Sequence, residues 1–129
     1  MNKILVEVSI GELLDKISIL EIKQEKIKDP EKLKFINNEY SILKEQLKKN
    51  VKSDDRLNKL YRSLKEINAK LWIIEDEKRQ CEKDKDFAEK FIKLSRDVHF
   101  LNDDRAKIKL EINNHTGSII KEIKEYTGY

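Results

Sequence analysis

The chain has 129 residues, 41% of them charged, and its 28 lysine and arginine residues against 25 acidic ones leave a formal net charge of +3. A chain of this length fits one domain, 1–129, with a real core, and so balanced a charge argues against a dedicated nucleic-acid binder. The single cysteine excludes an internal disulfide, and no apolar run reaches the roughly 18–20 residues that span a bilayer. We therefore expect one cytoplasmic domain without a membrane segment, and the abundance of Lys, Glu, Ile and Leu favours long helices.

The amino-terminal stretch combines an extended arm with the start of a helix. Residues 3–8 read KILVEV, and this β-branched, apolar composition predicts a short extended arm. Ser9 and Glu12 have the spacing of a capping box, which predicts a first helix over about 10–28. The apolar stripe of this helix is wide, so we expect it to be contacted from more than one side.

The Asp29-Pro30 pair separates the first helix from a second one predicted over about 30–49. Asp29 is a good cap, and proline is favoured at the first helical position. The end of the second helix is basic, which offers RNA binding as one alternative, although a solvated helix end is the commoner explanation when aromatic residues are absent. The lysines concerned are Lys44, Lys48, Lys49 and Lys52.

The central part of the chain predicts a long helical hairpin, with helices over about 54–82 and 86–115 and a turn at 83–86. Apolar residues recur at alternating steps of three and four, which is the spacing of a coiled-coil or bundle seam. Asp86, followed by Glu89, is the expected cap of the second hairpin helix. The first seam comprises Leu57, Leu60, Leu64, Ile67, Leu71, Ile74 and Cys81, and the second comprises Phe87, Phe91, Leu94, Val98, Leu101, Ile108 and Ile112.

Gly117 ends the hairpin, and Ser118 is the expected cap of a short carboxy-terminal helix from Ile119 to Tyr126. The fold class that follows is all-α, an antiparallel bundle built on the hairpin with the two earlier helices packed against it. The wide apolar face of the first helix and the extended arm also predict a homodimer, because such surfaces are typically covered by a partner.

Polar residues on or beside the hairpin seams are the candidate functional residues. Of the five arginines in the chain, Arg79, Arg96 and Arg105 lie there, although lysine is used for most other positive charges. Guanidinium offers a planar fork for carboxylate or phosphate. One interpretation is a structural polar layer that fixes helix register. The other is an anion-binding pocket formed by these arginines with Asn102 and Trp72.

Adjacent carboxylates offer a possible metal site, although such acids on a helix are usually solvated. Glu75 and Asp76 are the candidates for Mg²⁺, which accepts one or two carboxylates together with water and phosphate oxygens. His99 and His115 are too far apart in sequence for a paired zinc motif, and the chain has no phosphate-binding glycine loop and no Ser-His-Asp pattern.

A non-enzymatic interaction or scaffold module, self-associating, with a possible protein partner and no cofactor, is therefore the first functional hypothesis. The alternatives are a small-molecule binding protein or Mg²⁺-dependent enzyme acting on a phosphorylated or carboxylated ligand, and a weak RNA binder that uses the lysines of the second helix.

Three phrases carry a resemblance to a known family: VEVSIGELLDKISILEIK near the start, LWIIEDEKR in the middle, and FIKLSRDVHFLNDDRAKIKLEIN followed by Gly117-Ser118. Together they resemble a group of small bacterial and phage proteins of about this length, a family of unknown function. The resemblance covers nearly the whole chain and implies a stand-alone single domain. It implies no activity, cofactor or catalytic residue.

Overall fold

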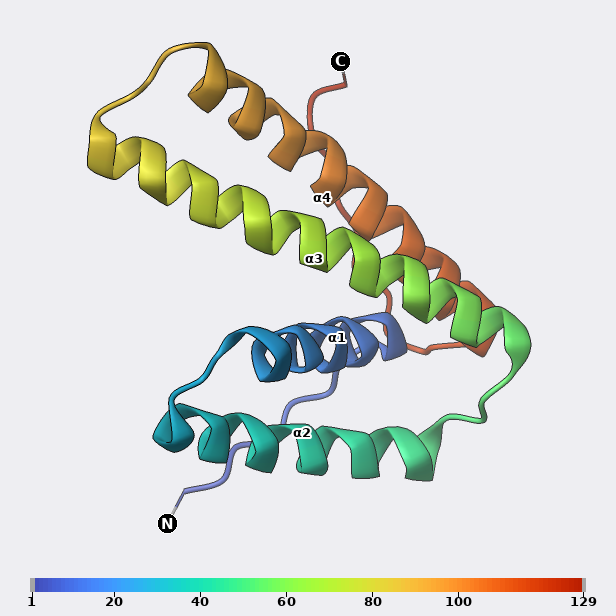
Figure 1. Cartoon of the computed structure of the whole chain (residues 1–129). Coiled ribbons are helices and arrows are strands. Elements are labelled where there is room, and N and C mark those ends of the chain that lie inside the picture. The colour runs from blue at the N-terminus through green and yellow to red at the C-terminus, as the bar shows by residue number, and fades with distance from the viewer. Residues whose placement is uncertain (1, 129) are drawn as a thin grey trace.

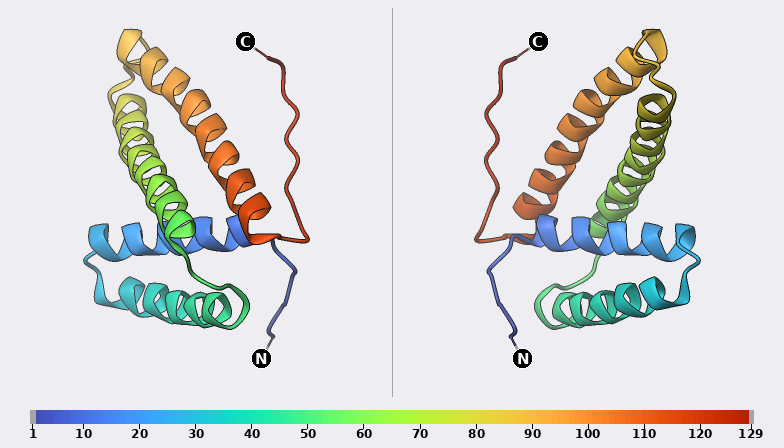
Figure 2. Two further views of the ribbon diagram at one scale, coloured as in Figure 1. Left: turned by 90° about the vertical axis from the view of Figure 1, so that its right-hand side faces the viewer. Right: turned by 90° about the vertical axis from the view of Figure 1, so that its left-hand side faces the viewer.

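The computed structural model describes residues 2–128, which form four α-helices (Figure 1). These are α1 (Ile10–Lys26), α2 (Pro30–Asn50), α3 (Asp55–Asp84) and α4 (Glu89–Thr116). The predicted all-α fold and its helical hairpin, α3 with α4, are confirmed. The views in Figure 2 show α1 crossing the open end of the hairpin, with α2 packed antiparallel to α1 on the side away from the hairpin.

Helix α1 is the centre of the fold because it contacts each of the other three helices. Its fully buried Ile17 and Ile22, together with Leu14, show that apolar residues point in several directions from its axis, as its wide stripe predicts. Leu14 belongs to the main core cluster, with three leucines of α3 and one isoleucine of α4: Leu57, Leu60, Leu64 and Ile112. The core therefore lies where α1 crosses the open end of the hairpin.

Local signals in the sequence account for most helix ends. Ser9 Oγ accepts a hydrogen bond from the Glu12 amide at 3.0 Å, and Asp29 Oδ1 accepts one from the Glu31 amide at 3.0 Å. Asp54 caps α3 through the Leu57 amide at 2.8 Å. Gly117 has a φ of 68°, in the left-handed region where glycine is unstrained, and it ends α4.

The start of α4 differs from the prediction. The helix begins at Glu89 and not at 86, its cap residue is Ala88, and no side chain makes a capping hydrogen bond there. Asp86 Oδ1 instead accepts a hydrogen bond from the Ala88 amide at 3.2 Å, within the turn itself. Aspartate side chains commonly make this local hydrogen bond in turns. Because the Asp86 carboxylate is used within the turn, it does not cap α4.

The predicted carboxy-terminal helix from Ile119 to Tyr126 is wrong, because residues 118–128 contain no helix. An isolated helix of this length is unstable unless it buries an apolar face. Ser118, the expected cap of that helix, serves α1 instead, since its Oγ accepts a hydrogen bond from the Ile10 amide at 3.1 Å. The tail is held to α4 by the Lys121 ammonium, which donates to Asn114 Oδ1 at 2.7 Å.

The amino-terminal arm, residues 2–8, extends from the start of α1 past α2, without helix or strand pairing among the described residues (Figures 1 and 2). The expected extended arm is thus present. Within residues 2–128, no helix has the length and apolar character to cross a membrane.

Candidate functional site

Polar side chains gather where α1 crosses the hairpin. They come from α1, α3 and α4, and they are buried although they are polar or charged. The buried members are Asp15, Ser18, Asn68, Lys109 and Asn113. We call this group, with Glu12 and Arg105 at its edge, the crossing cluster.

Asn68 lies at the centre of the crossing cluster. Its Nδ2 donates hydrogen bonds to Asp15 Oδ1 and to Ser18 Oγ, both at 2.8 Å, so both amide hydrogens are used. Its Oδ1 accepts a hydrogen bond from Arg105 Nη1 at 3.3 Å. Ser18 Oγ in turn donates to the Asp15 carbonyl oxygen at 2.7 Å. One α3 side chain therefore joins α1 to α4.

Lys109 is the buried positive charge of the crossing cluster, and it lies beside Glu12 and Asp15. Its Nζ lies 2.6 Å from Glu12 Oε2, 3.8 Å from Asp15 Oδ2 and 3.3 Å from Glu122 Oε2 of the tail. Burial works to lower the pKa of Lys109, but the hydrogen bond to Glu12 and the charge of Asp15 outweigh it and raise that pKa. Burial works to raise the pKa of Glu12, yet the Lys109 ammonium holds that pKa below its ordinary value. The pair therefore stays ionised at neutral pH.

The amino terminus of α1 is closed by side chains from both ends of the chain. The amides of Ile10, Gly11 and Glu12 donate to Ser118 Oγ, Asn113 Oδ1 and Ser9 Oγ, at 3.1, 2.7 and 3.0 Å. These are the amides that a helix leaves unpaired, and they are the groups that bind anions at other helix ends. This helix terminus therefore has no amide in its first turn to offer to an anionic ligand.

Gly11 allows α1 to approach α4 this closely. A Cβ atom built on Gly11 would lie 2.6 Å from the Lys109 carbonyl oxygen and 3.0 Å from Asn113 Oδ1. A side chain at this position would push the helices apart and break the hydrogen bond from the Gly11 amide. Glycine in the first turn of α1 is thus explained by helix packing.

The structure gathers only part of the predicted anion pocket. Arg105 contacts Asn68 across the hairpin, whereas Arg79 and Arg96 are exposed. Arg96 and Arg105 are nine residues apart on α4, which places them on opposite faces of the helix and about 14 Å apart along its axis. Asn102 and Trp72 are half-buried. The three arginines therefore do not converge on one ligand.

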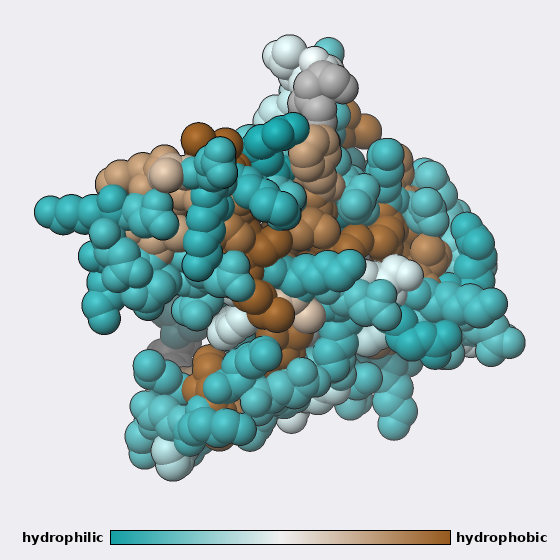
Figure 3. Space-filling model, turned by 45° about the horizontal axis from the view of Figure 1, so that its top comes forward, coloured by the Kyte–Doolittle hydropathy of each residue, from teal (hydrophilic) through white to brown (hydrophobic). Residues whose placement is uncertain are grey.

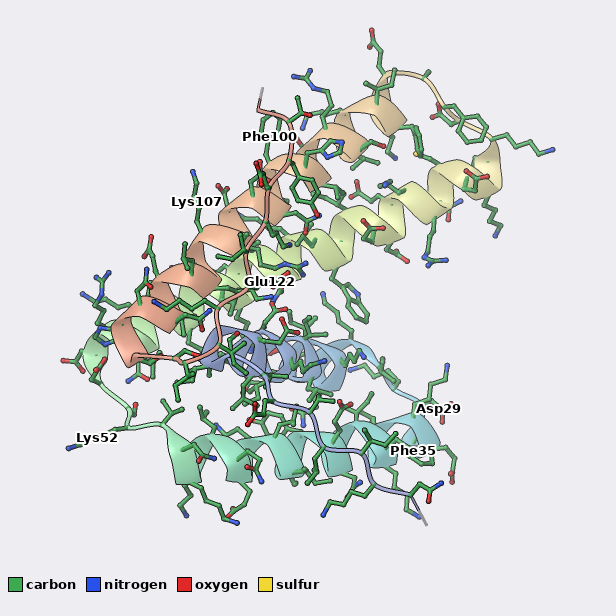
Figure 4. The ribbon with its side chains drawn as sticks, turned by 180° about the vertical axis from the view of Figure 1, so that it is seen from behind. Asp29, Phe35, Lys52, Phe100, Lys107 and Glu122 are labelled. Carbon is green, nitrogen blue, oxygen red and sulfur yellow. The ribbon has the colours of Figure 1, made fainter. Side chains whose placement is uncertain are left out.

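The remaining candidates also lie on the surface. Glu75 and Asp76 are exposed on α3, and residues 2–128 contain no group of three or more His, Cys, Asp or Glu side chains arranged to hold a metal ion. The four lysines at the end of α2 are exposed too, including Lys52 (Figure 4). The Lys44 ammonium lies 5.9 Å from the centre of the Tyr40 ring.

A second polar group fastens α2 and α3 to α1 through Glu21. The Tyr40 hydroxyl donates to Glu21 Oε2 at 2.8 Å, and the Tyr61 hydroxyl donates to Glu21 Oε1. Burial and the Glu21 carboxylate raise the pKa of Tyr40 to about 12, and the same causes raise the pKa of Tyr61. Lys65 pairs with Glu25 at 2.9 Å beside them.

Several residues of the crossing cluster and of the amino terminus of α1 were not predicted from the sequence, namely Asp15, Ser18, Lys109, Asn113 and Ser118. A usable signal was present, because Asp15 and Ser18 lie three residues apart on the buried side of α1, and Gly11 marks a close helix contact. Every buried side-chain nitrogen or oxygen in residues 2–128 has a hydrogen-bond partner. The crossing cluster therefore has the properties of a structural polar layer.

Apolar side chains, in contrast, remain uncovered in several places. Figure 3 shows them as a brown band across one face of the molecule, bordered by hydrophilic side chains. A groove of about 380 Å³ lies between α3 and α4 beyond α1, and its lining is mostly apolar: Ile73, Ile74, Phe100 and Leu101, together with Lys70 and Asp97. The arm and the tail expose further apolar residues, among them Ile4, Leu5, Val6, Ile119 and Ile123.

Comparison with known proteins identifies the family. The model of a family of unknown function, DUF6165, matches residues 4–129. The chain belongs to this family. No curated protein matches the chain, and no solved structure matches it. The resemblance found in the sequence is confirmed as to the family, and the family supplies no activity.

Proposed function

We propose that this member of DUF6165 is a non-enzymatic helical interaction module that acts through contacts with protein chains. The observation that carries the proposal is the amino-terminal arm, in which Ile4, Leu5 and Val6 are 85%, 83% and 75% exposed. Each large apolar side chain gains about 1.5–3 kcal/mol on full burial. Three of them in a row on the surface are typical of a segment that is covered by a partner.

The state of the polar groups supports the same proposal. The charged side chains of the crossing cluster are occupied with one another, and the amides of the first turn of α1 are occupied by side chains. A small-molecule site would need a few polar groups directed at the ligand. In this protein the groups left exposed are instead apolar side chains of the arm, the tail and the hairpin groove.

Site-specific photo-crosslinking in cells that express the protein tests this function. We expect Ile4→p-benzoylphenylalanine to give a discrete covalent adduct with a protein after irradiation, identified by mass spectrometry. The matched control places the same residue at Lys107, an exposed position on α4 (Figure 4). If position 4 gives no more adduct than position 107, the arm is not an interaction segment and the proposal fails.

A further inference from the structure

The arm has the alternation of a half-buried strand. Successive side chains of an extended segment point to opposite faces, so Ile4, Val6 and Val8 share one face and Lys3, Leu5 and Glu7 share the other. The first face is apolar from Ile4 to Val8. The second face carries one apolar residue between two opposite charges. An extended segment like this also has backbone N–H and C=O groups to offer to a neighbouring strand.

We propose that the arms of two copies of this chain pair as antiparallel strands centred on Leu5, which makes the protein a homodimer. In this register residue numbers that face each other add up to ten. Lys3 of one protomer then lies opposite Glu7 of its partner, Ile4 lies opposite Val6, and the two Leu5 side chains meet at the two-fold axis. Symmetry gives two Lys3–Glu7 pairs and two Ile4–Val6 pairs.

The charges select this register and direction. Among antiparallel registers, only the one centred on Leu5 places Lys3 directly opposite Glu7. A parallel pair in register would bring lysine against lysine and glutamate against glutamate, which is destabilising for directly opposed side chains. A second copy supplies the complementary strand because a two-fold interface joins the same patch on both chains. Because the arm is complementary to itself, a second copy of the chain is the partner that fits it.

The arm and the tail leave the bundle at one place, where the Ile10 amide donates to Ser118 Oγ. From there they run in opposite directions, the arm past α2 and the tail alongside the hairpin (Figures 2 and 4). Ile119 follows Ser118 directly and is 99% exposed. Two strands on their own make a marginal ribbon in water, so an exposed apolar side chain near the base of the arm is what such a dimer needs.

This inference rests on the proposed function and names its partner, and cysteine cross-linking tests it. In a Cys81→Ser background, we expect mild oxidation of Leu5→Cys to give a disulfide-linked dimer, because directly opposed strand residues have Cα atoms roughly 4.5–5.5 Å apart. Ile4→Cys and Val6→Cys are expected to cross-link with each other when mixed, and poorly alone. If Leu5→Cys cross-links no more than Lys107→Cys, a pair centred on Leu5 is excluded.

Charge reversal gives an independent test. We expect Lys3→Glu or Glu7→Lys to raise the dimer Kd on the order of tenfold in sedimentation velocity, because each places two like-charged pairs at the interface. The double variant is expected to restore the wild-type Kd, and failure of this rescue would overturn the register. If position 4 forms a photo-adduct with a different protein and Leu5→Cys forms no dimer, the partner is not a second copy of this chain. The proposed function would still hold in that case.

Discussion

At the scale of single residues, Lys109 shows how the crossing cluster holds separate segments together. Its ammonium is buried among the carboxylates of Glu12, Asp15 and Glu122, which come from α1 and from the tail. A buried charge is tolerated when paired, and removal of one partner leaves the others desolvated without compensation. Lys109 therefore joins α4 to the tail that follows it and to α1, where Glu12 lies 97 residues away in the sequence.

We predict that Lys109→Ala lowers the free energy of unfolding by about 3 kcal/mol, at the low end for a broken buried pair because Glu122 can turn toward water. Urea unfolding followed by circular dichroism measures the change. Lys107→Ala is the matched control, and as an exposed substitution on the same helix it should stay within about 0.5 kcal/mol of wild type. Lys109→Met keeps the aliphatic stem, so an unfolding free energy equal to wild type for this variant would contradict a role for the charge.

At the scale of elements, the docking of α2 depends on contacts that it makes at its surface, because none of its residues is fully buried. The Tyr40 hydroxyl supplies one such contact with Glu21 on α1. Leu47 adds an apolar contact with the core cluster near the carboxy-terminal end of the helix. Helix α2 is thus held by an apolar contact near this end and by a polar contact near its middle, and the polar contact depends on a protonated hydroxyl.

We predict that this contact is lost in alkali. The pKa of Tyr40 is raised from 10 to about 12 in the folded protein, so the protonated hydroxyl stabilises the fold fully below pH 10, and the contribution disappears as the pH rises through 12. The difference in ultraviolet titration between wild type and Tyr40→Phe should show a midpoint near pH 12. The difference between the unfolding midpoints of wild type and Tyr40→Phe should become smaller above pH 10. A titration midpoint at 10 would show that the hydroxyl is not engaged with Glu21.

At the scale of the whole molecule, the sequence predicted helices better than their connections. Three-four spacing and strong caps at Ser9 and Asp29 located α1 and α2, since both signals are local. The carboxy-terminal helix failed because its apolar residues find no helix to pack against. In the site, the three-four spacing placed Arg105 on or beside the hairpin seam, where it contacts Asn68. The pairing of Lys109 with Glu12 was missed because it depends on how α1 crosses α4, which no local pattern specifies.

The arrangement also predicts how stability is distributed along the hairpin. Polar contacts from α1 reach Asn68 on α3 and Lys109 on α4, so the segments near these residues are packed by three helices. Beyond them the buried residues, such as Cys81 and Leu94, belong to α3 and α4 themselves. Segments with fewer buried contacts open more often in the native state. The far half of the hairpin should therefore open without global unfolding.

Hydrogen exchange followed by mass spectrometry checks this expectation. Amides in residues 74–98 should exchange about tenfold or more faster than those in 60–68 and 105–113, because their opening leaves the crossing cluster intact. Leu64→Ala, in the shared core, should speed exchange in all these segments by lowering global stability. Leu94→Ala should act mainly on the far half. If amides of the wild type exchange at similar rates along both helices, the hairpin opens as one unit with α1. The prediction that residues 74–98 are locally less stable than the segments beside α1 would then be wrong.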